Sequence, residues 1–230
     1  MTKTKKIGII AAHPDDEILG CGGAVAKHVK NGDEVHVLIV AEGITARDTK
    51  RDVEARKDGL EFLSNCSKRA NEILGVSSLT MNNFPDNRMD SIERLDVIKL
   101  IEKFIKNISP EVIYTHFVND VNIDHRRVHD SVIAACRQLP GSIVKRLLFF
   151  EIASSTEWRP PLGATFSPNW FVDVSDTLST KLKALEAYNS EMRDFPHPRS
   201  LKALEYLSRW RGATIGVDAA EAFVLGRNVE

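Results

Sequence analysis

Short runs of apolar and β-branched residues alternate with longer amphipathic segments through the first two thirds of this 230-residue chain. The short runs predict buried strands, and the amphipathic segments predict helices. The expected strands are Lys6–Ala12, Glu34–Ala41, Ser78–Phe84, Glu111–Thr115 and Arg146–Ala153, and the expected helices are Glu17–Asn31, one that ends near Leu74, Ser91–Asn107 and His125–Leu139. Such alternation predicts an α/β fold, a Rossmann-like three-layer sandwich in which a mostly parallel sheet lies between two layers of helices.

The alternation ends after Ser154, and the rest of the chain predicts a long loop, one short strand and two more helices. These segments are Trp158–Pro161 with Ser167–Asn169, then Phe171–Val174, then Thr177–Met192 and Ser200–Arg211. We therefore expect a single domain over residues 1–230. It would consist of a βα core at 1–153 and a C-terminal extension at 154–230 that packs on the rim of the core.

The composition of the chain argues against nucleic acid as a partner and against insertion into a membrane. The 31 basic and 32 acidic residues nearly cancel, so no basic excess indicates nucleic-acid binding. No apolar stretch approaches the ~20 residues of a membrane-spanning helix, and the apolar run near the N-terminus is too short for a signal peptide. Three widely spaced cysteines suit a reducing compartment. We expect a cytoplasmic protein that binds a small molecule and does not insert into membranes; its oligomeric state is open, and a homo-oligomer is compatible with the sequence.

The stretch AAHPDDEILGCGG at 11–23 places one histidine and three consecutive acids at the end of the first expected strand. Adjacent carboxylates repel one another, and burial strengthens the repulsion, so a cation among them would resolve the conflict. A second polar cluster follows the fourth expected strand and consists of His116, Asp120, Asn122, Asp124, His125 and His129. Ligands bind at the carboxyl ends of strands at the switch point of a doubly wound sheet, so the two clusters can converge there.

The two clusters contain the donors of a metal site. His13, Asp16 and His125 would supply two imidazoles and one carboxylate with one position left open, the usual pattern of a catalytic zinc that activates water to attack a carbonyl. Asp16 would lie in a first helical turn, where the helix dipole favours a carboxylate. Asp15 would lie beside the metal, placed to take a proton from that water. Iron, cobalt or manganese also bind such donors.

Simpler interpretations compete with the metal site. The His-Pro-Asp-Asp turn could be a polar turn with a helix cap, and Asp124 with His125 could cap the next helix. Cys21 could be a ligand or a small buried thiol. Trp158 could stack on a sugar ring or pack the rim. The glycines at 20, 22 and 23 do not match the spacing of a dinucleotide-binding loop.

The stretch AHPDDEILGCGG resembles the N-terminal signature of the LmbE/PIG-L family of zinc-dependent N-deacetylases. NIDH at 122–125 stands where the second family motif is usually His-Pro-Asp-His, and NEILGV, FPDNRMD, SSTEW, PHPRS and AEAF are similar to a bacterial subgroup. The resemblance implies a lactate-dehydrogenase-like fold and hydrolysis of the N-acetyl group of an N-acetylglucosamine-type conjugate, which releases acetate and a free amine. It implies one Zn²⁺ per chain on His13, Asp16 and His125, with Asp15 as general base and later acid.

The second motif departs from the family at its first position. The histidine that usually stands there helps to stabilise the tetrahedral intermediate, and this chain has Asn122 instead. An amide can donate a hydrogen bond to an oxyanion but cannot carry a positive charge, and losing such a donor costs ~10²–10³ in rate. We expect Asn122 to act as the oxyanion donor, with His116 or His129 as substitutes. Asp124 would support a ligating histidine through its other nitrogen.

Four side chains are candidates for binding substrate. His197 and Arg199 lie in FPHPRS, a proline-stiffened turn that could contact a phosphate or sugar hydroxyls, or could form an ordinary loop with a salt bridge. His116 is the third candidate. Many family members carry a substrate-binding arginine before the helix that ends in LGV, and the candidates for it are Arg47, Arg51 and Arg56, of which we select Arg51.

Two other functions remain open at this stage. A phosphoesterase could use the same acids, but it would need more ligands and a second metal bridged by Asp15. A sugar- or nucleotide-binding relative could keep the fold without catalysis. The unliganded carboxylate of Asp15 argues against that loss, and the replacement of the motif histidine by Asn122 argues for it.

Overall fold

The computed structural model describes residues 4–160 and 163–230, so the predicted loop at Trp158–Pro161 ends outside the described residues. Its elements, in chain order, are β1 Lys6–Ala11, α1 Asp16–Lys30, β2 Glu34–Ala41, the short helix η1 Thr45–Arg47, α2 Lys57–Leu74, β3 Ser78–Phe84, the short helix η2 Met89–Ser91, α3 Arg94–Ile108, β4 Val112–His116, α4 Ile123–Ala135, β5 Arg146–Phe150, β6 Trp170–Asp173, α5 Leu178–Glu186, α6 Leu201–Ala213 and β7 Ala220–Asn228. The five alternations expected from the sequence are therefore confirmed.

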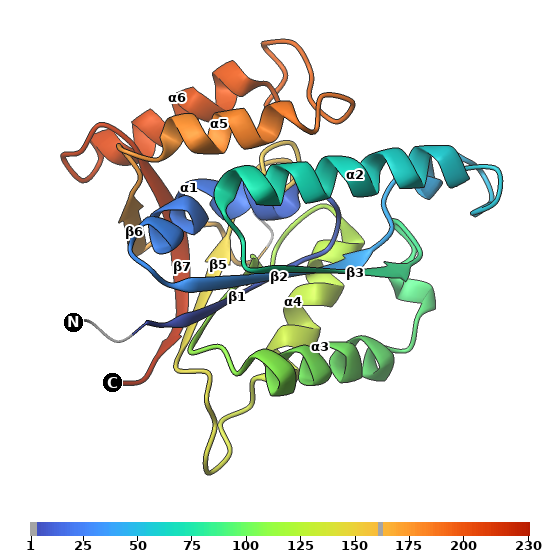
Figure 1. Cartoon of the computed structure of the whole chain (residues 1–230), viewed down its shortest axis with the longest axis horizontal. Helices are drawn as coiled ribbons and strands as arrows, with labels where there is room; N and C mark the ends of the chain where they lie inside the picture. Colours follow the sequence, from blue (N-terminus) through green and yellow to red (C-terminus); the bar gives the residue numbers. More distant parts are fainter. Residues whose placement is uncertain (1–3, 161–162) are drawn as a thin grey trace.

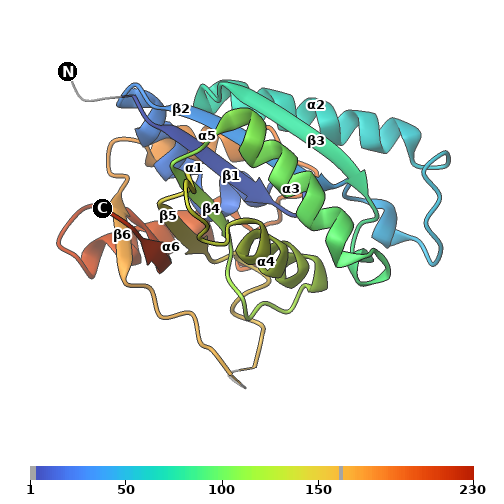
Figure 2. The same cartoon turned by 90° about the horizontal axis from the view of Figure 1, so that it is seen from below.

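One seven-stranded sheet runs through the described part of the chain in the order β3-β2-β1-β4-β5-β7-β6. The first five strands in chain order are parallel, and β7 is antiparallel to both β5 and β6. Helices α1, α2, α5 and α6 lie on one side of this sheet and α3 and α4 on the other (Figure 1), and the view from below brings α3 and α4 to the front (Figure 2). The predicted α/β fold of three layers with a mostly parallel sheet is confirmed.

The central strands supply apolar side chains to both layers. In β1, Ile7 and Ile9 join the core beneath α1 and α2, whereas Ile10 joins the core beneath α3 and α4. Successive side chains of a strand point to opposite faces, so a continuous apolar run fits a strand that is covered on both sides. This burial holds β1 rigidly, and the residues that follow it start from a fixed position.

The C-terminal extension does more than pack on the rim, and the sequence did not predict β7. This strand enters the sheet between β5 and β6. Its pattern is obscured because Glu221 is buried on a face where an apolar residue is usual. Helices α4 and α5 are also shorter than predicted, since they end at Ala135 and Glu186.

Candidate metal and catalytic site

The two polar clusters of the sequence meet at the switch point of the sheet. Strands β1 and β4 are parallel neighbours, with Ile10 beside Thr115, and the chain leaves them for opposite halves of the sheet. The turn after β1 carries His13, the first residue of α1 is Asp16, and the start of α4, after β4, carries His125. Their candidate ligand atoms all lie within 4.8 Å of one another. The predicted convergence of the two clusters is therefore confirmed.

The three donors surround a single point at the base of a cavity. Asp16 Oδ2 lies 3.3 Å from His13 Nδ1 and 3.3 Å from His125 Nε2. The side chains of Asp16 and His125 are 2% exposed and that of His13 is 11% exposed, and all three residues line the cavity. Two imidazole nitrogens and one carboxylate oxygen, with one side open, fit a divalent cation such as zinc.

Each of these imidazoles is oriented by a carboxylate on its other nitrogen. His13 Nε2 donates to Asp124 Oδ2 at 2.9 Å, and His125 Nδ1 lies 3.2 Å from Asp120 Oδ1. A carboxylate can only accept, so in the neutral imidazoles the lone pairs are on His13 Nδ1 and His125 Nε2, the nitrogens that lie 3.3 Å from Asp16 Oδ2. Such partners fix the tautomer and the direction of a metal-binding histidine.

Asp120 is itself held by several donors. It accepts from the Asn122 backbone N–H at 2.8 Å and from Thr156 Oγ1 at 2.7 Å, and it also accepts from Ser155 Oγ. Burial opposes the charge of this carboxylate, but the contact with His125 and these hydroxyls outweigh it and lower the pKa of Asp120 to about 2. The sequence placed Asp120 in the cluster but did not indicate Ser155 or Thr156, which come from the segment after β5.

A second group of potential donors consists of His13, Asp86 and Asp124. Here the carboxylates already accept other hydrogen bonds: Asp124 from the backbone N–H groups of Asn87 at 2.7 Å and Met89 at 3.0 Å, and Asp86 from Ala46 at 3.0 Å. In the first group, Asp16 Oδ2 also accepts the His13 backbone N–H, at 2.9 Å, but all three residues of that group line the cavity, whereas Asp124 does not.

Asp15 lies at the N-terminal end of α1 in a left-handed conformation, with φ of 99°. This conformation is strained for a residue with a side chain. Its carboxylate does not cap the helix and instead accepts from Arg199 Nη1 at 3.1 Å. Burial raises the pKa of Asp15 to about 8; Arg199 opposes this rise, and the neighbouring charge of Asp16 adds to it.

A buried network that the sequence did not reveal supports this strained turn. Glu17 Oε2 accepts from the Asp15 backbone N–H at 3.0 Å, and Glu17 Oε1 accepts from Tyr188 Oη at 2.6 Å and from Asn71 Nδ2 at 3.0 Å. Burial raises the pKa of Glu17 to about 7. The network ties Asp15 to α2 and to the segment that follows α5.

The cavity over these residues has a volume of about 450 Å³, which lies within the range of small-molecule sites. Its floor is the donor set, and its walls combine apolar side chains of Ile44, Leu63 and Val121 with charged ones. Trp158 also lines it and is 54% exposed. The indole that the sequence left unassigned therefore lies at the cavity.

Asn122 and Arg199 lie where the sequence predicted a role in the site, since both line the cavity. The Asn122 side-chain oxygen accepts from the Asp124 backbone N–H at 2.8 Å and caps α4. Because that oxygen faces the helix, Nδ2 is the free end of the amide. Within residues 4–160 and 163–230 no hydrogen bond is formed by this nitrogen, so it remains available to a ligand.

His116 does not line the cavity. It is fully buried, accepts the Ala12 backbone N–H on Nε2 at 2.8 Å, and stacks on His125 with ring centroids 4.1 Å apart. A nitrogen that accepts a hydrogen bond cannot carry a proton, and burial followed by the nearby His125 lowers the pKa of His116 well below its usual value. The prediction that His116 binds substrate or supplies a positive charge is contradicted by this placement.

His129 is also removed from the cavity. Its Nδ1 donates to the His116 carbonyl at 2.9 Å and its ring packs on Phe149. Burial lowers the pKa of His129. These contacts hold the end of β4 against α4, and they leave Asn122 and His125 as the polar groups of the second motif that line the cavity.

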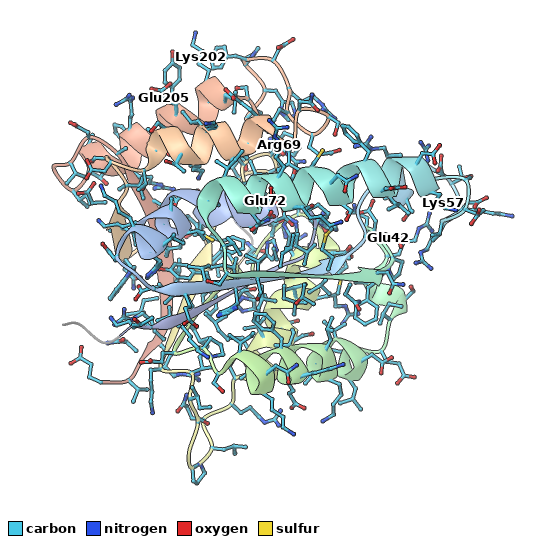
Figure 3. The ribbon with its side chains drawn as sticks, in the orientation of Figure 1. Glu42, Lys57, Arg69, Glu72, Lys202 and Glu205 are labelled. Carbon is cyan, nitrogen blue, oxygen red and sulfur yellow. The ribbon has the colours of Figure 1, made fainter. Side chains whose placement is uncertain are left out.

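Arg51 does not line the cavity, contrary to its predicted role. Its guanidinium donates to Glu42 at 2.8 and 2.7 Å and to the Asn83 carbonyl at 3.2 Å. Figure 3 shows Glu42 at the end of the sheet toward which β2 and β3 point. Arg47 lines the cavity instead.

His197 does not line the cavity but contacts two residues that do, Arg199 and Trp158. Its Nδ1 accepts the Arg199 backbone N–H at 3.0 Å, and its ring meets the edge of Trp158. The Arg199 guanidinium then reaches Asp15 and Ser154 Oγ, the latter at 3.1 Å. The FPHPRS turn therefore presents its arginine to the cavity, and its histidine holds that arginine's backbone.

The fold places at the switch point of its sheet a His/Asp cluster that could hold a metal ion. The family model for PIG-L, described as GlcNAc-PI de-N-acetylase, matches residues 9–136, which is more than half of the chain. This chain belongs to the PIG-L family, as the sequence motifs predicted, and it is an amidohydrolase of that family.

A relative supports the family, and solved structures share the fold. The uncharacterized deacetylase YaiS of Escherichia coli (strain K12) is 30% identical over 194 residues, which cover 82% of this chain and 92% of YaiS. N,N'-diacetylchitobiose deacetylase from Pyrococcus horikoshii matches with a TM-score of 0.77 at 22% identity, over 98% of this chain and 85% of that one. GalB, the 4-carboxy-2-hydroxymuconate hydratase of Pseudomonas putida KT2440, has a TM-score of 0.76 at 20% identity and 99% coverage of both chains. The fold thus carries more than one activity.

None of the helices in the described part of the chain has the length and apolar character needed to cross a bilayer.

Proposed function

We propose that this protein is a zinc-dependent hydrolase that removes the acetyl group from an N-acetylated amino sugar of the N-acetylglucosamine type. The observation that carries the proposal is the pairing of two features at the floor of one cavity. One is the open donor set of His13, Asp16 and His125, and the other is the unliganded carboxylate of Asp15 beside it. The family description and the diacetylchitobiose deacetylase structure support an N-acetyl sugar as substrate.

The donor atoms His13 Nδ1, Asp16 Oδ2 and His125 Nε2 would hold the cation. When bound, a divalent metal supplies Lewis acidity for the acetyl carbonyl and for the attacking water. The polar groups around the cavity then orient the amide and handle the protons. Asp120 and Asp124 keep the two imidazoles in the tautomers that face the cavity.

Asp15 would act first as base and then as acid. It takes one proton from the water whose oxygen attacks the acetyl carbon, and it gives that proton to the nitrogen as the C–N bond breaks, so that a neutral amine leaves. The products are acetate and a free amino sugar. Arg199, 3.1 Å from the same carboxylate, favours the ionised form that takes the proton.

Asn122 Nδ2 would donate to the oxygen of the acetyl group as negative charge develops on it. An amide that is already held by the cap of α4 needs little reorganisation to do so. In this proposal Asn122 stabilises the oxyanion in place of the histidine that usually stands at this position of the motif.

The competing phosphoesterase would use Asp15 to bridge a second metal. The contact of the Asp15 carboxylate with Arg199 favours the role in proton transfer, because a guanidinium beside a bridging carboxylate would oppose a second cation. The three cysteines, all buried and none of them in a disulfide, support a location in the reducing cytoplasm.

The test compares wild type with Asp15→Asn after both have been loaded with zinc. Acetate release from N,N'-diacetylchitobiose and from N-acetylglucosamine is measured together with the metal content of each preparation. We expect one zinc in both proteins and acetate from the wild type alone. Two metals per chain, or equal rates in the two proteins, would contradict the proposal.

A further inference from the structure

An ion pair joins two opposite walls of the cavity. Arg47 Nη2 donates to both carboxylate oxygens of Glu191, at 2.7 and 2.9 Å. Arg47 ends η1, in the segment after β2, and Glu191 follows α5, so the two residues are 144 positions apart in sequence. Both line the cavity, and the Glu191 side chain is 13% exposed.

The other guanidinium of the cavity is paired as well. Among the described residues that line it, the arginines are Arg47 and Arg199, and Arg199 donates to Asp15. The lining carboxylates are Asp15, Asp16, Asp86 and Glu191. Two guanidiniums and a divalent cation would balance these four acids, so no positive charge is left over for an anionic group of the substrate.

We propose that Glu191 masks Arg47 and thereby makes the cavity selective for uncharged N-acetyl sugars over those that carry a phosphate. This inference rests on the proposed function and specifies the substrate class. Glu191 holds Arg47 through Nη2 alone, and the Arg47 side chain is 48% exposed, so a phosphate that reached the other nitrogens of this guanidinium would lie beside the Glu191 carboxylate. Like charges placed together are a common means of rejecting a competing ligand.

The exposed indole of Trp158 fits the same class of substrate. It lines the cavity, is 54% exposed and makes an edge contact with His197. A flat apolar surface suits the C–H face of a sugar ring, whereas a phosphate needs hydrogen-bond donors.

The test measures selectivity with sugars that differ in charge. The kcat/KM for acetate release is determined for methyl N-acetyl-α-glucosaminide, N-acetylglucosamine 1-phosphate and N-acetylglucosamine 6-phosphate. Wild type should prefer the uncharged glycoside to both phosphates by about tenfold or more, because juxtaposed like charges are strongly disfavoured. Glu191→Gln should improve the ratio for at least one phosphate by about tenfold, the effect of one charge-assisted hydrogen bond.

Two further variants test whether the improved ratio for a sugar phosphate depends on Arg47. The double variant Glu191→Gln with Arg47→Met should lose the gain, since it removes the unmasked guanidinium. Asp48→Asn is the matched control: it frees Arg56, whose guanidinium is held by Asp48 at 2.6 Å in the same segment and does not line the cavity. Its selectivity ratio should equal that of wild type.

Binding to the zinc-loaded Asp15→Asn protein, measured by calorimetry, gives the same ratio without turnover. If no protein releases acetate but the Kd values favour the uncharged sugar and shift in Glu191→Gln, the proposed function fails and the selectivity stands. A wild-type preference for either phosphate, a Glu191→Gln ratio equal to that of Asp48→Asn, or no binding of any of the three sugars would overturn the inference.

Discussion

Two groups of buried charged residues lie along helix α1, and they differ in how completely their polar atoms are paired. At the start of the helix, Asp16 and the imidazoles of His13 and His125 converge on a cavity with their lone pairs toward it. Near the middle of the helix, Lys181 and Glu221 form an ion pair at 2.6 Å in which both side chains are about 95% buried. One group is open to a ligand and the other is closed.

The ion pair of Lys181 and Glu221 forms hydrogen bonds with the backbone of helix α1 beside a kink. At Cys21 the backbone has φ of −151° and the helix is kinked. Glu221 accepts the backbone N–H groups of Gly23 at 2.9 Å and Ala24 at 2.7 Å, and Lys181 donates to the Leu19 carbonyl at 2.9 Å. The pair therefore satisfies backbone groups beside the kink.

Gly23 allows this close approach. A Cβ at position 23 would lie 3.2 Å from the carboxylate carbon of Glu221 and 2.9 Å from Val174. The comparison teaches that burial and charge alone do not mark a functional site in this molecule. What distinguishes His13, Asp16 and His125 from the pair of Lys181 and Glu221 is that all three line the cavity.

The largest expected effect is the loss of the cation from the open group. Asp16→Ala removes the oxygen shared by the two imidazoles, so zinc affinity should fall by more than the ~10–100-fold that the loss of an outer-shell partner costs. Competition with a chromogenic chelator measures this. Retention of wild-type affinity would show that the cation binds elsewhere.

Next in size is the effect of breaking the closed group. Lys181→Met leaves Glu221 buried without its counter-ion, so the free energy of unfolding should fall by about 3–5 kcal/mol, with zinc affinity unchanged. Denaturant titration measures it. Lys30→Met is the control, since the pair of Lys30 with Asp176 is exposed and its loss should cost under about 1 kcal/mol. Equal losses in the two variants would remove the distinction between closed and exposed pairs.

A smaller effect distinguishes the two groups of potential donors around His13. Asp124→Asn weakens the partner of His13 Nε2 and should lower zinc affinity by ~10–100-fold. Asp86→Asn should change it less, because Asp86 lies 3.4 Å from the same nitrogen and is held mainly by other hydrogen bonds. The reverse order would indicate that the cation binds among His13, Asp86 and Asp124.

The smallest effect is expected in the network behind Asp15. Tyr188→Phe removes one of the donors to buried Glu17 and should lower the free energy of unfolding by about 1–3 kcal/mol. Thermal unfolding monitors the change. Ser190→Ala is a control in the same segment, where the hydroxyl is exposed and the nearest carboxylate oxygen of Glu191 lies 3.4 Å away. A loss in this control as large as that in Tyr188→Phe would exclude a special role for the network.

The open group was predictable because its residues follow two neighbouring parallel strands. His13 and Asp16 closely follow the carboxyl end of β1, and His125 comes nine residues after His116, at which β4 ends. The alternation of strands and helices predicted that those strand ends meet. For the same reason, the sequence could predict that Asp124 contacts the outer nitrogen of a candidate ligand histidine, which is His13 in the structure.

The closed group and the cavity walls were not predictable, because distant segments form them. Glu221 interrupts the apolar pattern of β7, and its buried charge is compensated by Lys181, 40 residues away, and by backbone N–H groups of α1, 198 and 197 residues away. Arg47 lines the cavity and pairs with Glu191, whereas Arg51 lies outside it and pairs with Glu42. No local pattern encodes these pairings.

The most direct test of the account is a crystal structure of the zinc-loaded protein, with the metal located by anomalous scattering at the zinc edge. The account predicts one peak per chain about 2.0–2.2 Å from His13 Nδ1, Asp16 Oδ2 and His125 Nε2, with Asp15 unliganded beside it. A peak among His13, Asp86 and Asp124, or two peaks bridged by Asp15, would contradict it.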